Sequence, residues 1–212
     1  VLGIQSQKIG ATVKHFACNN KETNRKNSDS RVSERAIREI YLKAFEIIVK
    51  KADPWAIMSS YNLINGHRAS ENKDLLTGIL RDEWGFKGMV MTDWFGGKDA
   101  VAQMVAGNDM LQPGLPKQYE AIVKGVQDGA LDEAILNQNV KRILEMILQT
   151  PHFKGYKYSN KPDLKAHAAV TRQSATEGMV LLKNDNGALP LAADVKNVAL
   201  FGCTSYDFIA GG

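Results

Sequence analysis

The sequence predicts an α/β fold in which helices lie outside a parallel sheet. Short apolar runs alternate with longer helical patterns in four β-then-α units, an order typical of parallel sheets. The strand runs are continuously apolar, as in a sheet that is covered on both faces. At roughly 150 residues per domain, the chain amounts to about 1.4 domains, so one domain and part of another are expected.

The first unit begins with a short strand over 11–13. Residues 14–16 follow at the carboxyl end of this strand. A polar loop follows from 19 to about 32. Residues 33–52 are expected to form a helix, because their apolar side chains recur every three or four positions along one stripe. Pro54 ends that helix, since proline lacks the amide hydrogen that a helix interior needs.

The second unit has a buried strand over 55–59, and residues 60–62 follow at its carboxyl end. Asn65 and Gly66 mark a turn, because both residues tolerate the backbone conformations that tight turns require. A helix over 73–84 completes the unit.

The third and fourth units follow in the same order. Their strands cover 88–92 and 109–111. The helices that come after these strands cover 100–106, 116–127 and 132–148.

The composition changes after the fourth unit. Prolines, glycine, lysines and tyrosines make 151–165 a linker between a first domain over 1–150 and a second domain over 166–212. In the second domain, 177–183 is expected to be a helix end or a strand, and 195–201 a strand.

Charge and composition exclude several classes of protein. Hydrophobic residues make up 44% and charged residues 24%, which excludes a disordered chain. No apolar run reaches the roughly 18 residues of a membrane span. The net charge is +4, and the basic stretch 21–31 is diluted by acidic and amide side chains, so we expect no nucleic-acid partner.

Cysteine and histidine spacing gives no sign of a metal site. Cys18 and Cys203 lie far apart in the chain and are expected to be separate thiols. The four histidines lack metal-ligand spacing, and no glycine-rich run has the pattern of a phosphate-binding loop. We therefore expect neither a metal nor a cofactor.

Polar side chains lie at or just beyond the ends of the predicted strands: Lys14, His15, Tyr61, Asp93 and Asp109. In parallel α/β barrels that face carries the active site. Structural explanations stay open for each residue. Asp93 could cap a helix, and Asp109 could stabilise a turn. Lys14 and His15 could form a partly buried pair, and Tyr61 could belong to the core.

Two chemistries suit this set of side chains. The carboxylate of Asp93 could attack an acetal carbon while Lys14 and His15 hydrogen-bond sugar hydroxyls. Trp94 could then stack on a sugar ring. Alternatively, Lys14 could form a Schiff base, as in barrel lyases and aldolases. The local chemistry alone does not separate the two.

An ordered set of longer motifs resembles glycoside hydrolase family 3 over essentially the whole chain. The motifs are Lys14-His15-Phe16 with Asn19-Asn20 and Arg25; Met58-Ser59-Ser60-Tyr61-Asn62 with Asn65-Gly66; Leu80-Arg81-x-Glu83-Trp84-Gly85-Phe86-x-Gly88; Val90-Met91-Thr92-Asp93-Trp94; Ala106-Gly107-x-Asp109 with Pro113-Gly114; and Glu177-Gly178-x-Val180-Leu181-Leu182-Lys183-Asn184.

This resemblance implies an exo-acting, retaining β-glycosidase. Residues 1–150 would be the C-terminal half of a TIM-type (β/α)8 barrel, and 166–212 the start of an α/β sandwich domain. Asp93 would be the nucleophile that forms the glycosyl-enzyme. The proton donor is expected to be a glutamate beyond Gly212, and the first half of the barrel would precede Val1.

The resemblance also assigns the substrate-binding residues. Lys14 and His15 would bind hydroxyls of the terminal sugar, and Tyr61 would lie beside the nucleophile. Met58 and Trp94 would line the pocket. Glu22 and Arg25 would support the site, and the resemblance gives no role for Arg68.

Two departures narrow the expected activity. Residues 17–20 lack the histidine-containing loop of members that cleave N-acetylglucosaminides. Trp94 stands where xylosidase-like members usually have cysteine. We therefore expect a β-glucosidase acting on a β-glucoside or oligosaccharide. A β-xylosidase-like enzyme and a non-catalytic carbohydrate-binding relative are the alternatives, and a lyase using Lys14 is a remote one.

The resemblance also bears on partners and location. The remainder of the same polypeptide would be needed to complete the site, and a homodimer is possible. A periplasmic or secreted location is favoured by the family, although a cytoplasmic one occurs among its members.

Overall fold

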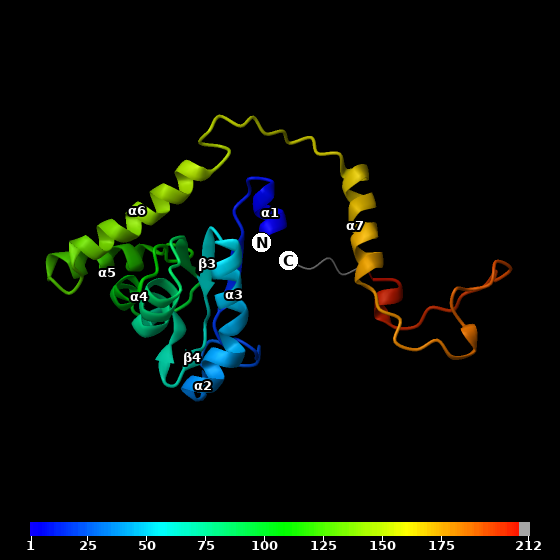
Figure 1. Ribbon diagram of the computed structural model, residues 1–212, viewed down its shortest axis with the longest axis horizontal. Coiled ribbons are helices and arrows are strands. Elements are labelled where there is room, and N and C mark those ends of the chain that lie inside the picture. The colour runs from blue at the N-terminus through cyan, green and yellow to red at the C-terminus, as the bar shows by residue number, and fades with distance from the viewer. Residues whose placement is uncertain (208–212) are drawn as a thin grey trace. The chain divides into compact units, whose positions relative to one another are not determined.

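The computed structural model describes residues 1–207, and its chain divides into two compact units, Val1–Lys157 and Tyr158–Gly212 (Figure 1). The boundary falls inside the stretch expected to be a linker. Within the described residues, no helix is long and apolar enough to cross a membrane.

The first unit is built on a parallel sheet. Its strands are β1 (Thr12–Phe16), β3 (Ala56–Ser59) and β6 (Met89–Thr92), in the order β1-β3-β6. β3 and β6 pair without a register shift, whereas the ladder of β1 and β3 shifts between Val13 and Phe16. The parallel sheet and the three strands expected from the apolar runs are thereby confirmed.

The fourth strand is much shorter than expected. Instead of a strand over 109–111, a single parallel bridge joins Met91 to Met110. The amide of Thr92 donates to the carbonyl of Met110, but the amide of Gln112 donates to the side-chain Oγ1 of Thr92. The ladder stops because a side chain takes the place of the next backbone acceptor.

The helices expected over 33–52 and 73–84 occur where the periodic apolar side chains indicated. The stretch expected as one helix over 33–52 contains α2 (Glu34–Ala36), the π-helix η1 (Ile37–Tyr41) and α3 (Lys43–Ala52). The helix expected over 73–84 is the π-helix η3 (Asp74–Glu83). The periodicity thus predicted the helices but not their π-type winding.

Three further helices follow in the order expected from the sequence. They are α4 (Ala100–Ala106), α5 (Pro116–Gln127) and α6 (Glu133–Gln149). Asp132 caps α6 by accepting a hydrogen bond from the amide of Ala134 at 2.8 Å. Two shorter elements, α1 (Leu2–Ser6) and η2 (Ala69–Glu71), complete the helical part of this unit.

A second, small sheet lies beyond the carboxyl end of β3. It consists of β2 (Asp29–Ser30), β4 (Leu63–Ile64) and β5 (His67–Arg68), in the order β2-β4-β5. Asn65 and Gly66 connect β4 to β5 with φ values of 50° and 89°. The expected turn is confirmed, and its two positive φ values are those of a tight hairpin.

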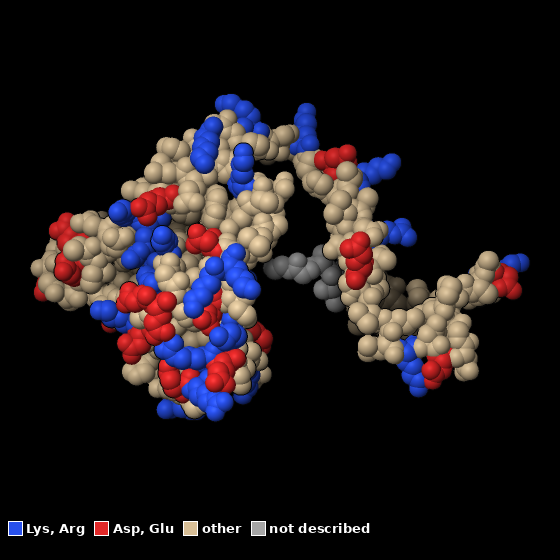
Figure 2. All heavy atoms as spheres, in the orientation of Figure 1, with Lys and Arg blue, Asp and Glu red and all other residues tan. Residues whose placement is uncertain are grey.

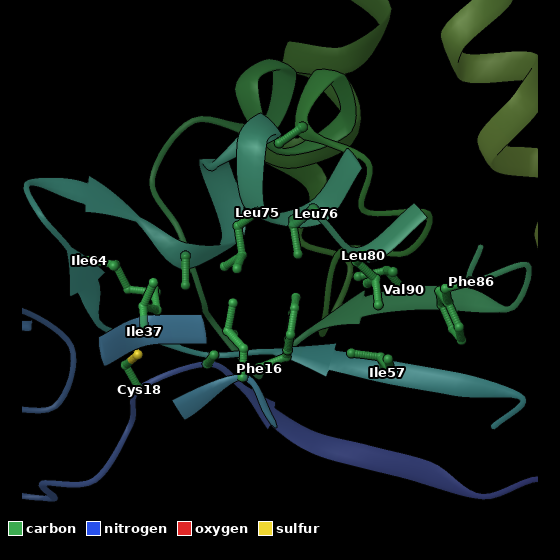
Figure 3. Close-up of a cluster of buried hydrophobic side chains, with 14 of the residues drawn as sticks. Phe16, Cys18, Ile37, Ile57, Ile64, Leu75, Leu76, Leu80, Phe86 and Val90 are labelled. Atoms are coloured by element: carbon green, nitrogen blue, oxygen red, sulfur yellow. The ribbon is translucent and has the colours of Figure 1, made fainter. Parts of the chain in front are cut away.

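The main hydrophobic core lies between the parallel sheet and η3 (Figure 3). The buried side chains of Phe16, Ile57 and Val90 come from the three strands, and Leu76 and Leu80 come from η3. Because helix and sheet bury their apolar faces against each other, this packing fixes the strands under the helical layer.

The opposite face of the sheet is less covered at the carboxyl ends of the strands. Met58 and Met91 follow the buried Ile57 and Val90, so they point to the other face, and both are only half-buried. Burial on both faces, which the continuous apolar strands indicated, is found along β3 and β6 except at these two methionines.

Acidic and basic side chains alternate over the face of the first unit shown in Figure 2. Among the ion pairs of this unit, Arg38 contacts both Glu34 and Glu83. Such exposed pairs contribute little stability each, so they describe a solvated surface.

In the second unit, the helix end expected within 177–183 is found, because a helix ends at Gly178. The unit contains α7 (Leu164–Gly178) and two short 3₁₀ turns, η4 (Asp185–Gly187) and η5 (Cys203–Ser205). The strand expected over 195–201 is wrong: within the described part of this unit there is no strand.

The reason is that an apolar run becomes a strand only against a neighbour. Leu182 is 91% exposed and Phe201 is 89% exposed, so neither run has a neighbouring strand or a covering layer among residues 158–207. Gly211 and Gly212, which belong to the expected second domain, lie outside the described residues.

Candidate active site

Asp93 lies directly after β6, at the carboxyl end of the sheet. Its amide donates to the carbonyl of Ser59 at 3.1 Å, which ties its backbone to β3. Its Oδ1 accepts a hydrogen bond from the amide of Trp94 at 2.7 Å. The side chain is only 14% exposed. The second oxygen of this carboxylate, Oδ2, is therefore available at the carboxyl edge of the parallel sheet. The side chains gathered at this edge, His15, Tyr61, Asp93 and Trp94, are called the mouth of the site below.

His15 reaches the same point from β1. Its Nε2 lies 3.4 Å from Oδ2 of Asp93, although β3 separates the two strands in the sheet. Burial lowers the pKa of His15 below its usual value and outweighs the raising effect of Asp93; the charge of Lys14 lowers the pKa further. The imidazole is thus neutral at pH 7 and lies beside an anionic group.

Tyr61 follows β3 and lies next to the carboxylate of Asp93. Its hydroxyl donates a hydrogen bond to the carbonyl of Trp94 at 2.7 Å. Burial raises the pKa of Tyr61, and the nearby carboxylate of Asp93 raises it further. The phenol therefore remains a protonated hydrogen-bond donor at neutral pH.

The remaining sequence-derived candidates are Lys14, Met58 and Trp94. Lys14 is exposed on β1 and lines a cavity of about 360 Å³ together with His15. Met58 is half-buried in β3, opposite Met91. Trp94 is 57% exposed. The structure thus brings His15, Tyr61 and Asp93 into one cluster, with Trp94 at its edge.

The loop after β1 places three charged side chains near Tyr61. The sequence implied a supporting role for two of them, Glu22 and Arg25, and did not identify the third, Lys26. The guanidinium of Arg25 lies 4.8 Å from the ring centroid of Tyr61 and forms an ion pair with Glu22 at 2.8 Å. The ammonium of Lys26 lies 5.4 Å from the same ring. Two basic side chains therefore lie near the ring of Tyr61. No sequence pattern singled out Lys26, because a lysine in a polar loop has no distinctive spacing.

Asp109 does not belong to the mouth. Its Oδ2 accepts hydrogen bonds from Arg81 at 2.7 Å and from the amide of Val90 at 2.8 Å, and its Oδ1 accepts one from Arg142 at 3.0 Å. Its side chain is fully buried. These contacts support a structural role for Asp109, which the sequence had left open beside a role in the active site.

The cluster combines a fixed carboxylate, a neutral imidazole, a phenol and an exposed indole. Hydrogen-bonding groups beside an aromatic face can bind a sugar ring, and a carboxylate can act as a nucleophile at an acetal carbon. Among residues 1–207, no group of three or more His, Cys, Asp or Glu side chains is arranged to hold a metal ion.

Comparison with known families gives an extended match. The model of the glycosyl hydrolase family 3 N terminal domain matches residues 1–146.

Individual relatives match over nearly the whole chain. The exo-α-(1→6)-L-arabinopyranosidase of Bifidobacterium longum is 45% identical over 198 residues, which cover 91% of this chain and 25% of the relative. The thermostable β-glucosidase B of Acetivibrio thermocellus is 45% identical over 194 residues, which cover 90% of this chain and 25% of the relative.

A solved structure agrees in fold as well as in sequence. β-Glucosidase 3B of Thermotoga neapolitana, solved in complex with α-D-glucose, superposes with a TM-score of 0.85 at 49% identity. The match covers 91% of this chain and 28% of that structure. The chain therefore spans about a quarter of the length of the relatives that it matches.

Proposed function

The chain belongs to glycosyl hydrolase family 3, and from this premise we propose that it is part of a retaining, exo-acting β-glucosidase with Asp93 as its nucleophile. The observation that carries the proposal is the position of the Asp93 carboxylate, fixed by its neighbour's amide and approached within 3.4 Å by His15. Relatives named β-glucosidase, at 45% and 49% identity over about nine-tenths of this chain, support the substrate class.

In the first step, an oxygen of Asp93 attacks the anomeric carbon of the terminal glucose. The bond from that carbon to the leaving-group oxygen breaks, and that oxygen takes a proton from a general acid. In the second step, water attacks the same carbon and gives a proton to the deprotonated glutamate. The bond from the carbon to Asp93 breaks, which regenerates the carboxylate of Asp93 and the acid form of the glutamate. The general acid would be a glutamate beyond Gly212, about 5–5.5 Å from Asp93, the separation that retaining enzymes use.

The surrounding side chains would hold the terminal sugar. Lys14 and the neutral His15 would hydrogen-bond its hydroxyls from β1. Tyr61 would fix the mouth through its bond to the Trp94 carbonyl. Met58 and the exposed indole of Trp94 would supply the apolar surface against which a pyranose ring stacks.

The architecture we propose is the C-terminal half of a (β/α)8 barrel, followed by the start of an α/β sandwich domain. The successive strands β1, β3 and β6 and the bridge at Met110 lie side by side in chain order, as in a barrel. Helices cover the face that contains Ile57, and the half-buried Met58 lies on the face that would become the barrel interior.

A mechanism-based label tests the nucleophile. The full-length protein is incubated with a 2-fluoro glucoside, which slows hydrolysis of the glycosyl-enzyme, and the labelled peptide is mapped. We expect the label on Asp93 and no label in the Asp93→Asn variant. A label on another carboxylate would assign the nucleophile elsewhere, and full turnover by Asp93→Asn would contradict the mechanism.

A second candidate activity follows from one relative, the arabinopyranosidase at 45% identity. The two activities are separated by kcat/KM of the full-length protein on nitrophenyl β-D-glucopyranoside and on nitrophenyl α-L-arabinopyranoside. A higher value on the glucoside supports the proposal, and a higher value on the arabinoside favours the second candidate. Nitrophenyl β-D-xylopyranoside is assayed as a third substrate. If none of the three substrates is hydrolysed, the carbohydrate-binding alternative is favoured. Borohydride trapping of substrate on Lys14 would favour the lyase.

A further inference from the structure

Phe95 is an exposed aromatic residue in an uncommon backbone conformation at the edge of the candidate site. Its φ is 60°, a left-handed value that bulky side chains rarely adopt. The amide of Phe95 donates to the carbonyl of Gln112 at 3.0 Å, which holds this conformation. The ring is nevertheless 53% exposed. A strained conformation that presents an apolar ring to solvent is typical of binding sites.

The ring of Phe95 extends an aromatic surface that begins at Trp94. The two ring centroids lie 6.2 Å apart in an edge-on arrangement. Both rings are more exposed than the carboxylate of Asp93 next to them, which is 14% exposed. The pair therefore forms the outer part of the mouth, and Asp93 the deeper part.

Lys26 completes this surface from the loop after β1. Its ammonium lies 5.7 Å from the ring centroid of Phe95 and 5.4 Å from that of Tyr61. Cations at these distances from aromatic rings are attracted to the ring faces. Lys26 thus lies over two aromatic side chains and keeps N–H donors at the rim of the site.

Arg68 fixes the backbone that supports Lys26. From β5, its Nη1 donates to the carbonyl of Lys26 at 2.9 Å, and its Nη2 lies 3.5 Å from Oδ1 of Asn27. The hairpin that contains Arg68 is closed by the Asn65-Gly66 turn. The loop is therefore attached to a regular element and not only to the aromatic rings.

We propose that Phe95 and Lys26 bind the leaving-group part of the glycoside and that Arg68 is a positioning residue for Lys26. This inference rests on the proposed function, because it takes the terminal sugar to lie at Asp93. A substrate whose anomeric carbon reaches the buried carboxylate has its leaving group on the outer side, where Phe95 and Lys26 lie. The aromatic face suits a sugar ring or an aryl group, and the ammonium can donate to its oxygens.

The proposal separates the two chemical steps. Contacts with the leaving group act until its bond to the anomeric carbon breaks, so their loss lowers kcat/KM. They are absent when water attacks the glycosyl-enzyme. Inhibition by free glucose bound at Asp93 should likewise be unaffected, because glucose has no leaving group.

The test uses the full-length protein with cellobiose and with nitrophenyl β-glucoside. In the Phe95→Ala and Lys26→Met variants we expect kcat/KM to fall about three- to tenfold on cellobiose, the size of one stacking or cation contact. The Ki of glucose should stay within twofold of the wild type. Arg68→Ala should reproduce the loss seen in Lys26→Met, and Arg68→Ala added to Lys26→Met should lower kcat/KM no further.

Matched controls exclude general effects of substitution. Lys21→Met removes an exposed lysine from the same loop, and Tyr119→Ala removes an exposed aromatic ring from α5. Both should keep the wild-type kcat/KM. If Phe95→Ala folds poorly by circular dichroism, Phe95→Leu keeps the apolar volume without the ring and should show the same loss.

Two results would overturn the inference while leaving the proposed function in place. One is unchanged kcat/KM in both Phe95→Leu and Lys26→Met. The other is a Ki of glucose that rises as much as kcat/KM falls, since that would place the two side chains at the terminal sugar. Failure of the wild type to hydrolyse either glucoside would instead contradict the proposed function.

Discussion

The contact between His15 and Asp93 sets the charge of the candidate site at the scale of single residues. Burial lowers the pKa of His15, and the carboxylate partly opposes that effect. A histidine with a lowered pKa stays neutral as the pH falls to its usual titration range, and becomes charged only below that range. In the proposed function, His15 would therefore hydrogen-bond a sugar without neutralising the proposed nucleophile, Asp93.

This arrangement predicts opposite shifts for two substitutions. Asp93→Asn removes the charge that raises the pKa of His15, so the pKa should fall further. Lys14→Met removes a positive charge that lowers it, so the pKa should rise. The measurement is a pH titration by NMR of ring-labelled histidine in the full-length protein, with the wild type as reference. A shift of the same sign in both variants would contradict the electrostatic account.

Buried ion pairs connect separate elements at the next scale. Asp109 precedes the bridge at Met110 and binds Arg81 of η3 and Arg142 of α6. The guanidinium of Arg81 also donates to the carbonyls of Gly88 and Gly107. Burial lowers the pKa of Arg81 to about 10, so it stays protonated at neutral pH. One buried carboxylate thus links two helices and the amide of Val90 in β6.

Removing that carboxylate's charge should be costly. Asp109→Asn leaves two guanidinium groups without a counter-charge, and breaking a buried pair in this way costs about 3–5 kcal/mol. We expect a clear drop in the urea midpoint of inactivation of the full-length protein. Asp128→Asn, which breaks the exposed pair with Lys124, is the control and should change the midpoint little. Equal effects of the two substitutions would refute a structural role for Asp109.

The hairpin that holds Arg68 depends on a glycine. Gly66 has a φ of 89°, and an added Cβ would meet only the end of the Arg31 side chain at 3.9 Å. Gly66→Ala should therefore lower the stability by about 1–2 kcal/mol through backbone strain alone. Gly78→Ala is the matched control, because Gly78 lies inside η3 with nothing within 4 Å of the added Cβ.

Alanine at position 78 should be neutral or stabilising by up to about 1 kcal/mol, because glycine is a poor helix former. Both variants are compared by thermal unfolding. A lower melting temperature in Gly78→Ala than in Gly66→Ala would show that the turn does not require glycine.

At the scale of the whole molecule, the first unit leaves part of its sheet uncovered. Met58 and Met91 are half-buried, and α6 exposes the apolar side chains of Leu144, Ile147 and Leu148. Exposed apolar surface of this extent marks places where further protein packs. The proposed half-barrel explains it, since the other half would cover these side chains.

The 212 residues alone should therefore lack glucosidase activity, although they contain Asp93. We expect turnover of nitrophenyl β-glucoside by the full-length protein and none by the isolated chain. The isolated chain should also bind a hydrophobic dye such as ANS, which reports exposed apolar surface. Turnover by the isolated chain would contradict the assignment of the proton donor to a region beyond Gly212.

The sequence alone determined the α/β class, the three parallel strands, the helices between them and the Asn65-Gly66 turn. These features depend on local patterns: apolar periodicity, a proline, a glycine at positive φ and capping side chains. The same patterns placed Asp93 and His15 at strand ends.

Only the tertiary structure decided which side chains meet. Asp109 is bound by two arginines that lie 28 and 33 residues away along the chain, so its role depends on helix packing. Lys26, Arg68 and Phe95 form contacts that depend on how a loop folds over the sheet. The apolar run at 195–201 did not become a strand, because a strand needs a neighbour that local sequence does not supply.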